Sequence, residues 1–359
     1  RQFNYSPFFM DIMTGYLGDI ALVNGTPDAW LSVDNGLYRF RLLNGSNARV
    51  FRIALSDNHP FHIIGSDSGL LAEPIEVTSA WLAPGERTEI LVDFSTYNPG
   101  NSVVLKSLPF FSSGGMMGGG MMGGSSQGIE MDLMRFYVDT EANGANSVPD
   151  ALVSIPSLDP AAAKRTRVFN LSPSGMMLHS INGLLWDVDR VDFSVPWGEL
   201  EIWEYRNISM HPHPMHMHAA LFQVLDRNGS QNVRPEDKGW KDTVLVDAGE
   251  TVRILVRFDS HPGVFVHHCH NLEHEDSGMM QNFEVLPNPT PVIRITSTET
   301  IISWPGALNG WILRSSDSPA HNSDWQTVSQ QPSKVNDEWI VTIPGVSNQK
   351  FYRLDPPDA

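Results

Sequence analysis

The chain has 359 residues, which is enough for two or three domains. Its 24 Lys and Arg against 41 Asp and Glu give a formal net charge of −17, and this acidic balance argues against a nucleic-acid-binding surface. No apolar run is long enough to cross a bilayer, and the one cysteine cannot form a disulfide within the chain.

Residues 1–140 are expected to form a first β-domain. After a linker at 1–13, short alternating segments are separated by Asn-Gly and Asp-Gly turns at 23–25, 34–36 and 43–45. Alternation broken by such turns is typical of an all-β sandwich.

A glycine- and methionine-rich stretch at 112–128 is expected to be a loop near the end of this domain. Its paired methionines are Met116, Met117, Met121 and Met122. Soft thioethers could capture Cu(I). The alternative is an insertion whose methionines are incidental or absorb oxidants, and the sequence leaves both open.

The rest of the chain is predicted to hold a linker at 141–164, a second β-domain at 165–287 and a small β-rich accessory module at 291–359. Short strand-like segments of the module contain four tryptophans that we expect in its core: Trp304, Trp311, Trp325 and Trp339. About 70 residues are enough for a small sandwich.

The two larger domains are copies of one unit. Residues 23–25, 59–62 and 83–94 recur as 181–183, 213–216 and 247–258, with the motifs VNG, HPFH and APGERTEILVDF becoming ING, HPMH and DAGETVRILVRF. The first copy lacks a cysteine, so we expect His59 and His62 to be structural and the first domain to be metal-free.

The second copy contains the ligands of a copper site. Two histidines, a cysteine and a weak thioether form the ligand set of a blue-copper electron-transfer centre. The segments HPHPMHMH (211–218) and HHCHNLEHEDSGMM (267–280) provide this set, which we assign to His213, Cys269, His274 and Met279 as type 1 copper ligands.

Four further histidines indicate a second metal site behind the first. Successive side chains of a strand point to opposite faces, so His268 and His270 should point away from Cys269. His216 and His218 are also two residues apart and share a face. We predict that these four histidines form half of a trinuclear copper cluster.

With these motifs, the chain resembles the second and third cupredoxin domains of three-domain multicopper oxidases, the family of laccases, bilirubin oxidases and bacterial cuprous oxidases. The resemblance covers about residues 14–287 and is closest to the bacterial branch through LNGSNAR (43–49), WKDTVLV (240–246) and LEHEDSGMM (272–280). It implies an all-β fold of two cupredoxin-like Greek-key sandwiches followed by a small C-terminal sandwich.

The resemblance also implies an activity. Such enzymes oxidise phenolic or aromatic reductants, or Cu(I), one electron at a time at type 1 copper and reduce dioxygen to water at the trinuclear cluster. A reductant would dock near an exposed edge of His274 or His213, and Cys269 would connect the site to His268 and His270. Glu275 matches the family's proton-relaying acid, and Asp242 matches a carboxylate near the substrate edge of type 1 copper. Secretion or export to the periplasm follows from the family.

Half of the trinuclear cluster is not encoded in these residues. The family uses four more histidines from an N-terminal cupredoxin domain, and we expect this domain to be supplied in cis, by a longer polypeptide, or in trans, by a partner chain. Loss of oxidase activity is the third explanation. The alternative function is therefore a type 1 copper electron-transfer or copper-binding protein that does not reduce oxygen.

Overall fold

The computed structural model describes residues 8–110, 127–142, 147–175, 178–319, 324–345 and 349–355. Strands dominate it, as predicted, and none of its described helices is long and apolar enough to cross a membrane. The methionines of the predicted Cu(I)-capturing loop, Met116, Met117, Met121 and Met122, lie outside the described residues.

The chain forms two compact units. The first comprises Arg1–Asp192, Leu200–Arg257 and Phe265–Asn282, and the second comprises Phe193–Glu199, Phe258–Val264 and Phe283–Ala359.

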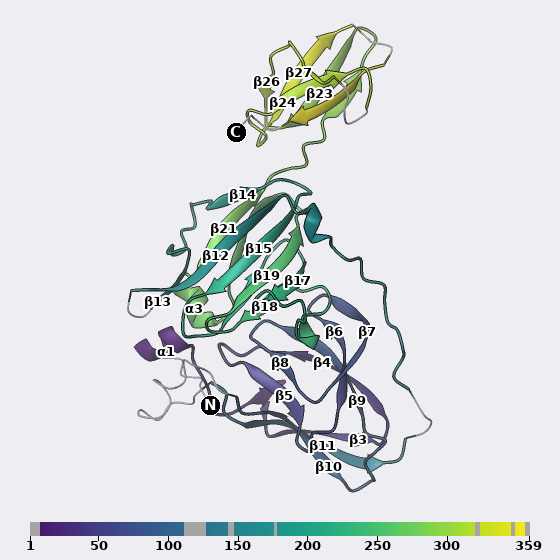
Figure 1. The fold of residues 1–359 in the computed structure, drawn as a ribbon, viewed down its shortest axis with the longest axis vertical. Coiled ribbons are helices and arrows are strands. Elements are labelled where there is room, and N and C mark those ends of the chain that lie inside the picture. Colours follow the sequence, from purple (N-terminus) through teal and green to yellow (C-terminus); the bar gives the residue numbers. More distant parts are fainter. Residues whose placement is uncertain are drawn as a thin grey trace. The chain divides into compact units, whose positions relative to one another are not determined.

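An N-terminal sandwich in the first unit is built from two sheets whose strand orders are β3-β11-β10-β5-β8 and β4-β9-β6-β7 (Figure 1). Helix α1 (Phe9–Thr14) and a two-stranded sheet of β1 (Leu22–Val23) and β2 (Thr26–Pro27) come first in the chain. The strands of the sandwich are β3 (Ala29–Asp34), β4 (Leu37–Leu43), β5 (Phe51–Leu55), β6 (Phe61–Ser66), β7 (Gly69–Val77), β8 (Ala80–Leu82), β9 (Arg87–Asp93), β10 (Ser102–Ser107) and β11 (Met131–Thr140). Alternate side chains of both sheets meet in one buried core that includes Ile53, Phe61 and Phe136.

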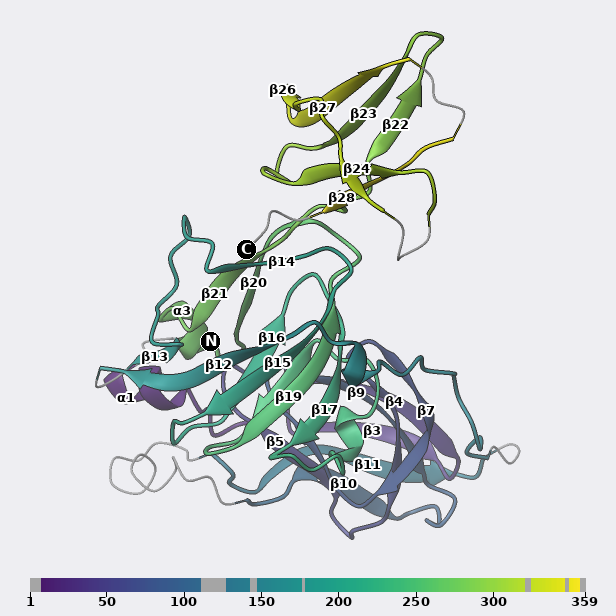
Figure 2. The same cartoon turned by 45° about the horizontal axis from the view of Figure 1, so that its top comes forward.

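A central sandwich follows, with strand orders β13-β12-β15-β19-β17 and β14-β21-β20-β16-β18. Its elements are η1 (Pro160–Ala162), β12 (Arg165–Ser174), β13 (Leu178–Ile181), β14 (Phe193–Val195), β15 (Leu200–Asn207), β16 (His213–Met217), β17 (Phe222–Arg227), η2 (Pro235–Asp237), β18 (Thr243–Val246), β19 (Thr251–Arg257), β20 (Gly263–Cys269), α3 (Leu272–Asp276) and β21 (Met280–Val285). Strands β12, β15, β19 and β17 run side by side in Figure 2.

Two of the three repeated motifs occupy similar places in the two sandwiches, but HPFH and HPMH do not. Phe61 and His62 lie in β6, which pairs with β9, whereas His213–His216 lie in β16, which pairs with β18 and β20. Asn24 and Asn182 both adopt a positive φ, of 50° and 54°, and each is followed by a glycine of positive φ, as an Asn-Gly turn requires. The repeated PGE and AGE segments both precede a central strand, β9 in one sandwich and β19 in the other.

The C-terminal strands form a third pair of sheets, with orders β22-β23-β27-β26 and β25-β24-β28. They are β22 (Val292–Ile295), β23 (Glu299–Pro305), β24 (Ile312–Ser316), β25 (Gln326–Thr327), β26 (Ser333–Val335), β27 (Glu338–Pro344) and β28 (Phe351–Asp355). Trp304 is buried in the core between these sheets, and Trp311 and Trp339 pack against it, whereas Trp325 lies under the guanidinium of Arg353 at 4.5 Å.

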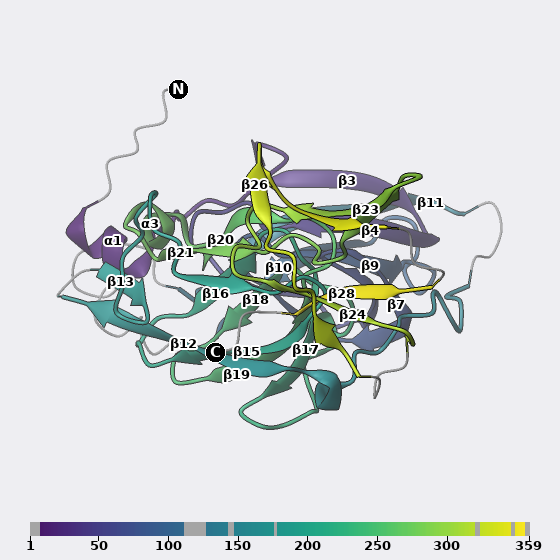
Figure 3. The same cartoon turned by 90° about the horizontal axis from the view of Figure 1, so that it is seen from above.

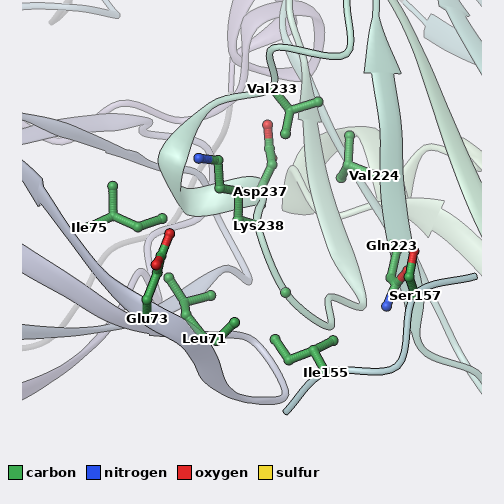
Figure 4. A pocket seen from close by; sticks show the side chains of 12 residues that line it. Leu71, Glu73, Ile75, Ile155, Ser157, Gln223, Val224, Val233, Asp237 and Lys238 are labelled. Carbon is green, nitrogen blue, oxygen red and sulfur yellow. The ribbon is translucent and has the colours of Figure 1, made fainter. Parts of the chain in front are cut away.

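One cavity of about 290 Å³ lies in the first unit, between β7, β17, η2 and the segment before η1 (Figure 4). Apolar side chains such as Leu71, Ile75 and Val224 line it together with Glu73 and Lys238. None of the predicted copper ligands is among its lining residues.

Candidate copper centres

Strands β16 and β20 place the histidines and the cysteine on two faces of one sheet. They pair antiparallel, with Met215 opposite Cys269 and His216 opposite His268. Side chains alternate along each strand, so His213 and Cys269 share one face while His216 and His268 share the other. One pair of strands therefore carries two groups of metal-binding side chains.

The loop after β20 brings the remaining residues of the first group together. Asn271 begins helix α3 as its N-cap, and its side chain accepts a hydrogen bond from the backbone N–H of His274 at 3.5 Å. The chain then turns back: the Met279 N–H donates to the His274 carbonyl at 2.9 Å, and the Cys269 N–H donates to the Met279 carbonyl at 3.1 Å. Met279 is completely buried beside these residues.

Three ligand atoms of the first group form a small triangle. The Cys269 Sγ lies 3.5 Å from the Nδ1 of His213 and 3.6 Å from the Nδ1 of His274, and the two Nδ1 atoms are 3.2 Å apart. A point about 2.0 Å from all three atoms lies at its centre, which matches metal–imidazole bonds and approaches metal–thiolate bonds. A trigonal His₂Cys arrangement is the geometry of type 1 copper.

Hydrogen bonds on the outer side of each ring select the tautomer that suits a metal. The Nε2 of His274 lies 3.1 Å from the Met13 carbonyl, which can only accept, so Nε2 carries the proton and Nδ1 presents its lone pair. The Nε2 of His213 lies 2.8 Å from the Ser209 hydroxyl, which donates to the Asn207 side chain and therefore accepts from His213. Both lone pairs face the Cys269 sulfur.

Burial sets the protonation state of the first group. It raises the pKa of the Cys269 thiol, and it lowers the pKa of His213 and His274 well below the ordinary value. The histidines are therefore neutral at pH 7 and the thiol keeps its proton until a metal displaces it. The residues present fit a type 1 copper ion.

The second group consists of His216, His218 and His268, whose ligand atoms lie within 4.8 Å of one another. The ring of His270 lies beside them, with its centroid 5.7 Å from those of His216 and His268. Burial lowers the pKa of His218 to about 4 and also lowers the pKa of His270, so both rings are neutral at pH 7. The structure thus brings together all four histidines predicted for the trinuclear half-site.

Glu275 lies against the second group. Its Oε2 is 3.3 Å from the Nδ1 of His268, and the Cys269 carbonyl lies 3.2 Å from the same nitrogen. Both are acceptors, so Nδ1 carries the proton and Nε2 is left for a metal. Burial raises the pKa of Glu275, but the hydrogen bond from His268 and the nearby imidazoles of His268, His270 and His216 together outweigh it, and the pKa lies below its ordinary value.

Two expectations about the substrate edge need correction. Asp242 contacts His216 and Arg87, in the second group, and not the outer edge of His213 or His274. Burial raises its pKa, but hydrogen bonds from His216 and Arg87 hold it well below its usual range. His213 and His274 are 0% and 1% exposed, and the outer nitrogens of their rings are bonded to Ser209 and Met13, so neither ring presents an exposed edge.

Three hydrogen bonds to the outer nitrogens of histidine rings were not predicted from the sequence: those of the Met13 carbonyl to His274 and His179, and that of Ser209 to His213. The Met13 carbonyl belongs to helix α1, which lies beside β13 and α3 (Figure 3), and it also bonds the Nε2 of His179 at 3.0 Å. Ser209 had a usable signal: Asn-x-Ser occurs at the same place in both sandwiches. In each copy the asparagine binds two backbone carbonyls and accepts from its own serine, at 44–46 and 207–209.

Ser209→Ala tests this outer contact. The substitution leaves the buried Nε2–H of His213 without its acceptor, and we expect copper at the first group to bind about 10- to 100-fold more weakly. Ser46→Ala is the matched control, because Ser46 makes the same contacts with Asn44 and Arg49 and touches no histidine. Competition with a copper chelator measures both affinities. Equal affinities for the two variants would contradict the assignment of Ser209.

Gly85→Ala tests the second group. Gly85 has φ +82°, and a Cβ there would lie 2.4 Å from the Cδ2 of His270, so the ring must move. The equivalent turn of the repeat contains Gly249, with φ +75° and no neighbour within 4 Å, which makes Gly249→Ala a control for backbone strain alone. We expect only Gly85→Ala to weaken Zn²⁺ binding at the second group, measured by calorimetry on protein loaded with copper at the first. Identical losses in both variants would show that strain alone is responsible.

Comparison with known proteins agrees with this geometry. Two family models described as multicopper oxidase match residues 157–289 and 16–114. Laccase from Bacillus subtilis (strain 168) is 32% identical over 297 residues, which are 76% of this chain and 56% of the laccase. Cell division protein FtsP from Dickeya dadantii is 36% identical over 271 residues, 74% of this chain and 54% of that protein. The crystal structure of McoA multicopper oxidase from Aquifex aeolicus superposes with a TM-score of 0.70 at 36% identity, over 79% of this chain and 62% of that one.

The chain belongs to the multicopper oxidase family, whose cofactor is copper, and its all-β, cupredoxin-like fold is confirmed. It spans about half the length of the curated relatives it matches.

Proposed function

We propose that this chain is the part of a laccase-like multicopper oxidase that takes electrons from a phenolic or cuprous reductant and contributes half of the site where dioxygen is reduced to water. His213, Cys269, His274 and Met279 would hold type 1 copper. His216, His218, His268 and His270 would hold their share of a trinuclear cluster.

One observation carries this proposal: the two groups occupy opposite faces of the β16–β20 pair and are joined through Cys269. A simple copper electron carrier needs only the first group. The second group collects three imidazoles within 4.8 Å, with a fourth ring nearby, and such a cluster has no use in a carrier.

Each chemical role falls to residues whose surroundings suit it. Bound copper would supply one-electron redox chemistry at the first group and dioxygen binding at the second. Cys269 is the covalent neighbour of both His268 and His270, which makes the path between the groups short. Glu275, bonded to His268 and partly exposed, can exchange protons with water and hold one next to the second group. Met13 covers the outer nitrogen of His274, so a reductant would approach across α1.

Four further histidine ligands are needed to close a trinuclear cluster, and we propose that another cupredoxin domain supplies them, in cis or in trans. The metal-free N-terminal sandwich contacts the central sandwich beside the second group through Gly85 and Arg87. We also propose that the protein is exported to the cell exterior or the periplasm, as the resemblance to the family implies. The methionines of 112–128 would capture Cu(I).

Anaerobic reduction tests the first half of this function. Chain loaded with Cu(II) is mixed with a methoxyphenol or with Cu(I), and we expect either reductant to bleach the thiolate-to-copper absorption. Dioxygen uptake is expected only when a first domain from a related three-domain enzyme is added or fused. A bleached chain that gains no oxygen uptake from an added domain would favour the electron-transfer alternative.

A further inference from the structure

The segment Trp240–Asp242 of the central sandwich is bound by a loop of the N-terminal sandwich. The Trp240 carbonyl accepts hydrogen bonds from the Ser66 hydroxyl at 2.9 Å and from the Ser68 N–H at 3.1 Å. Asp67, between them, accepts from the backbone N–H groups of Asp242 and Thr243 at 3.3 Å and 3.2 Å. Contacts on consecutive residues fix this segment against the metal-free sandwich.

Arg87 completes the contact as a two-pronged bond to Asp242. Its Nη1 and Nη2 donate to the Oδ1 and Oδ2 of Asp242 at 2.7 Å and 2.6 Å. The guanidinium is itself held by the carbonyls of Gly85 and Asp67, at 3.0 Å and 2.8 Å. A paired guanidinium–carboxylate bond fixes orientation as well as distance, which a single ammonium cannot do.

From Asp242 the hydrogen bonds continue to His216. The Thr243 hydroxyl donates to the Asp242 Oδ1 at 2.9 Å and therefore has lone pairs to accept from the Nδ1–H of His216, 3.0 Å away. The Asp242 carbonyl accepts from the same nitrogen at 2.9 Å. The Asp242 carbonyl can only accept, so the Nδ1 of His216 carries the proton, which leaves Nε2 for a metal in the second group.

The repeat shows that this pair is an addition to the shared fold. Positions 83–94 and 247–258 correspond, so Arg87 corresponds to Thr251 and, just before the preceding strand, Asp242 corresponds to Thr78. The neighbouring Glu86 and Glu250 are kept in both copies, where each accepts a backbone N–H from the residue three before it. Of the four positions 78, 87, 242 and 251, only 87 is an arginine and only 242 is an aspartate, and these two meet beside His216.

We propose that Arg87 is a positioning residue for the second group: the metal-free sandwich, through Arg87, Asp242 and Thr243, fixes the tautomer and the ring orientation of His216. This inference rests on the proposed function, which makes His216 a metal ligand. It gives the metal-free sandwich a part in the metal site beyond that of a spacer.

Nitrogen NMR on metal-free protein with ¹⁵N-labelled histidine tests the proposal directly, at a pH where the rings are neutral. In the native chain, we expect His216 as a single Nδ1–H tautomer. Arg87→Gln should give a mixture of tautomers and weaken Zn²⁺ binding at the second group about 10- to 100-fold. Arg87→Lys keeps the charge but loses the paired bond. Its tautomer mixture and its Zn²⁺ affinity should lie between those of the native chain and of Arg87→Gln.

Arg39→Gln is the matched control, because Arg39 makes a similar pair with Glu89 inside the N-terminal sandwich. A pure Nδ1–H tautomer in both folded Arg87 variants would overturn the proposal, as would an equal change in the Arg39 variant. The tautomer is read without metal, so a native chain that binds no Zn²⁺ at the second group would refute the proposed function and leave this test intact.

Discussion

Cys269→Ser is expected to abolish the visible thiolate-to-copper absorption and to remove one tightly bound copper per chain. Cys269 is completely buried, and its sulfur is the one thiolate donor in the triangle with His213 and His274. A serine hydroxyl is not a soft donor, so the group loses the bond that defines type 1 copper. Absorption spectroscopy together with elemental analysis measures both losses.

His218→Ala provides the control on the other face of the same sheet. His218 belongs to the second group, so its removal should leave the absorption intact and affect only metal bound behind it. Copper should also bind more tightly to the first group as the pH rises, because burial raises the pKa of Cys269 and copper must displace the thiol proton. Absorption that survives in the serine variant would show that the colour arises elsewhere.

Lys241→Met is expected to destabilise the first unit by about 3–5 kcal/mol, as removal of one partner of a buried ion pair does. The Lys241 Nζ lies 3.2 Å from Asp67 and 3.4 Å from Glu86, and all three side chains are at most 3% exposed. Burial lowers the pKa of Lys241, but Asp67 and Glu86 outweigh it and keep the ammonium charged. Its loss leaves Glu86 without its ammonium partner and Asp67 with the more distant Arg87 guanidinium, whose Nη1 is 4.0 Å away.

Urea unfolding at two pH values measures this cost. Burial raises the pKa of Glu86 and Lys241 lowers it, so without the lysine Glu86 takes up a proton more readily. A carboxyl whose pKa is raised in the folded state lowers stability once the pH rises above its pKa in the unfolded chain. The loss of unfolding free energy in Lys241→Met should therefore be larger at pH 8 than at pH 5. Lys106→Met is the control, because its partner Glu130 is half exposed and such pairs contribute about 0–1 kcal/mol. Equal losses would contradict the role of burial.

The alternation of side chains along a strand was enough to predict which histidines lie together. His216, His218 and His268 lie together because β16 and β20 pair in the register that places them on one face, and the sequence contains that two-residue period. The Cys269, His274 and Met279 spacing is similarly local, since one short helix and one turn bring them together. The expectation of all-β sandwiches relied on the same period and on Asn-Gly turns.

Contacts between distant segments could not be predicted in this way. Asp242 was assigned to the substrate edge, but its partner Arg87 lies 155 positions away in the other sandwich, and no local pattern links them. Met13 acts through its backbone carbonyl, which any residue provides, so its side chain gave no signal. Ser209 could have been found, because Asn-x-Ser recurs in both copies of the repeat.

Copper per chain, measured with the absorption spectrum after Cu(II) loading and removal of loosely held metal, tests the central claim most directly. The triangle of His213, Cys269 and His274 predicts about one tightly bound copper per chain with the thiolate-to-copper band, because only the first group is complete. A chain that retains no copper, or whose copper gives no such band, would contradict the assignment of type 1 copper to these residues.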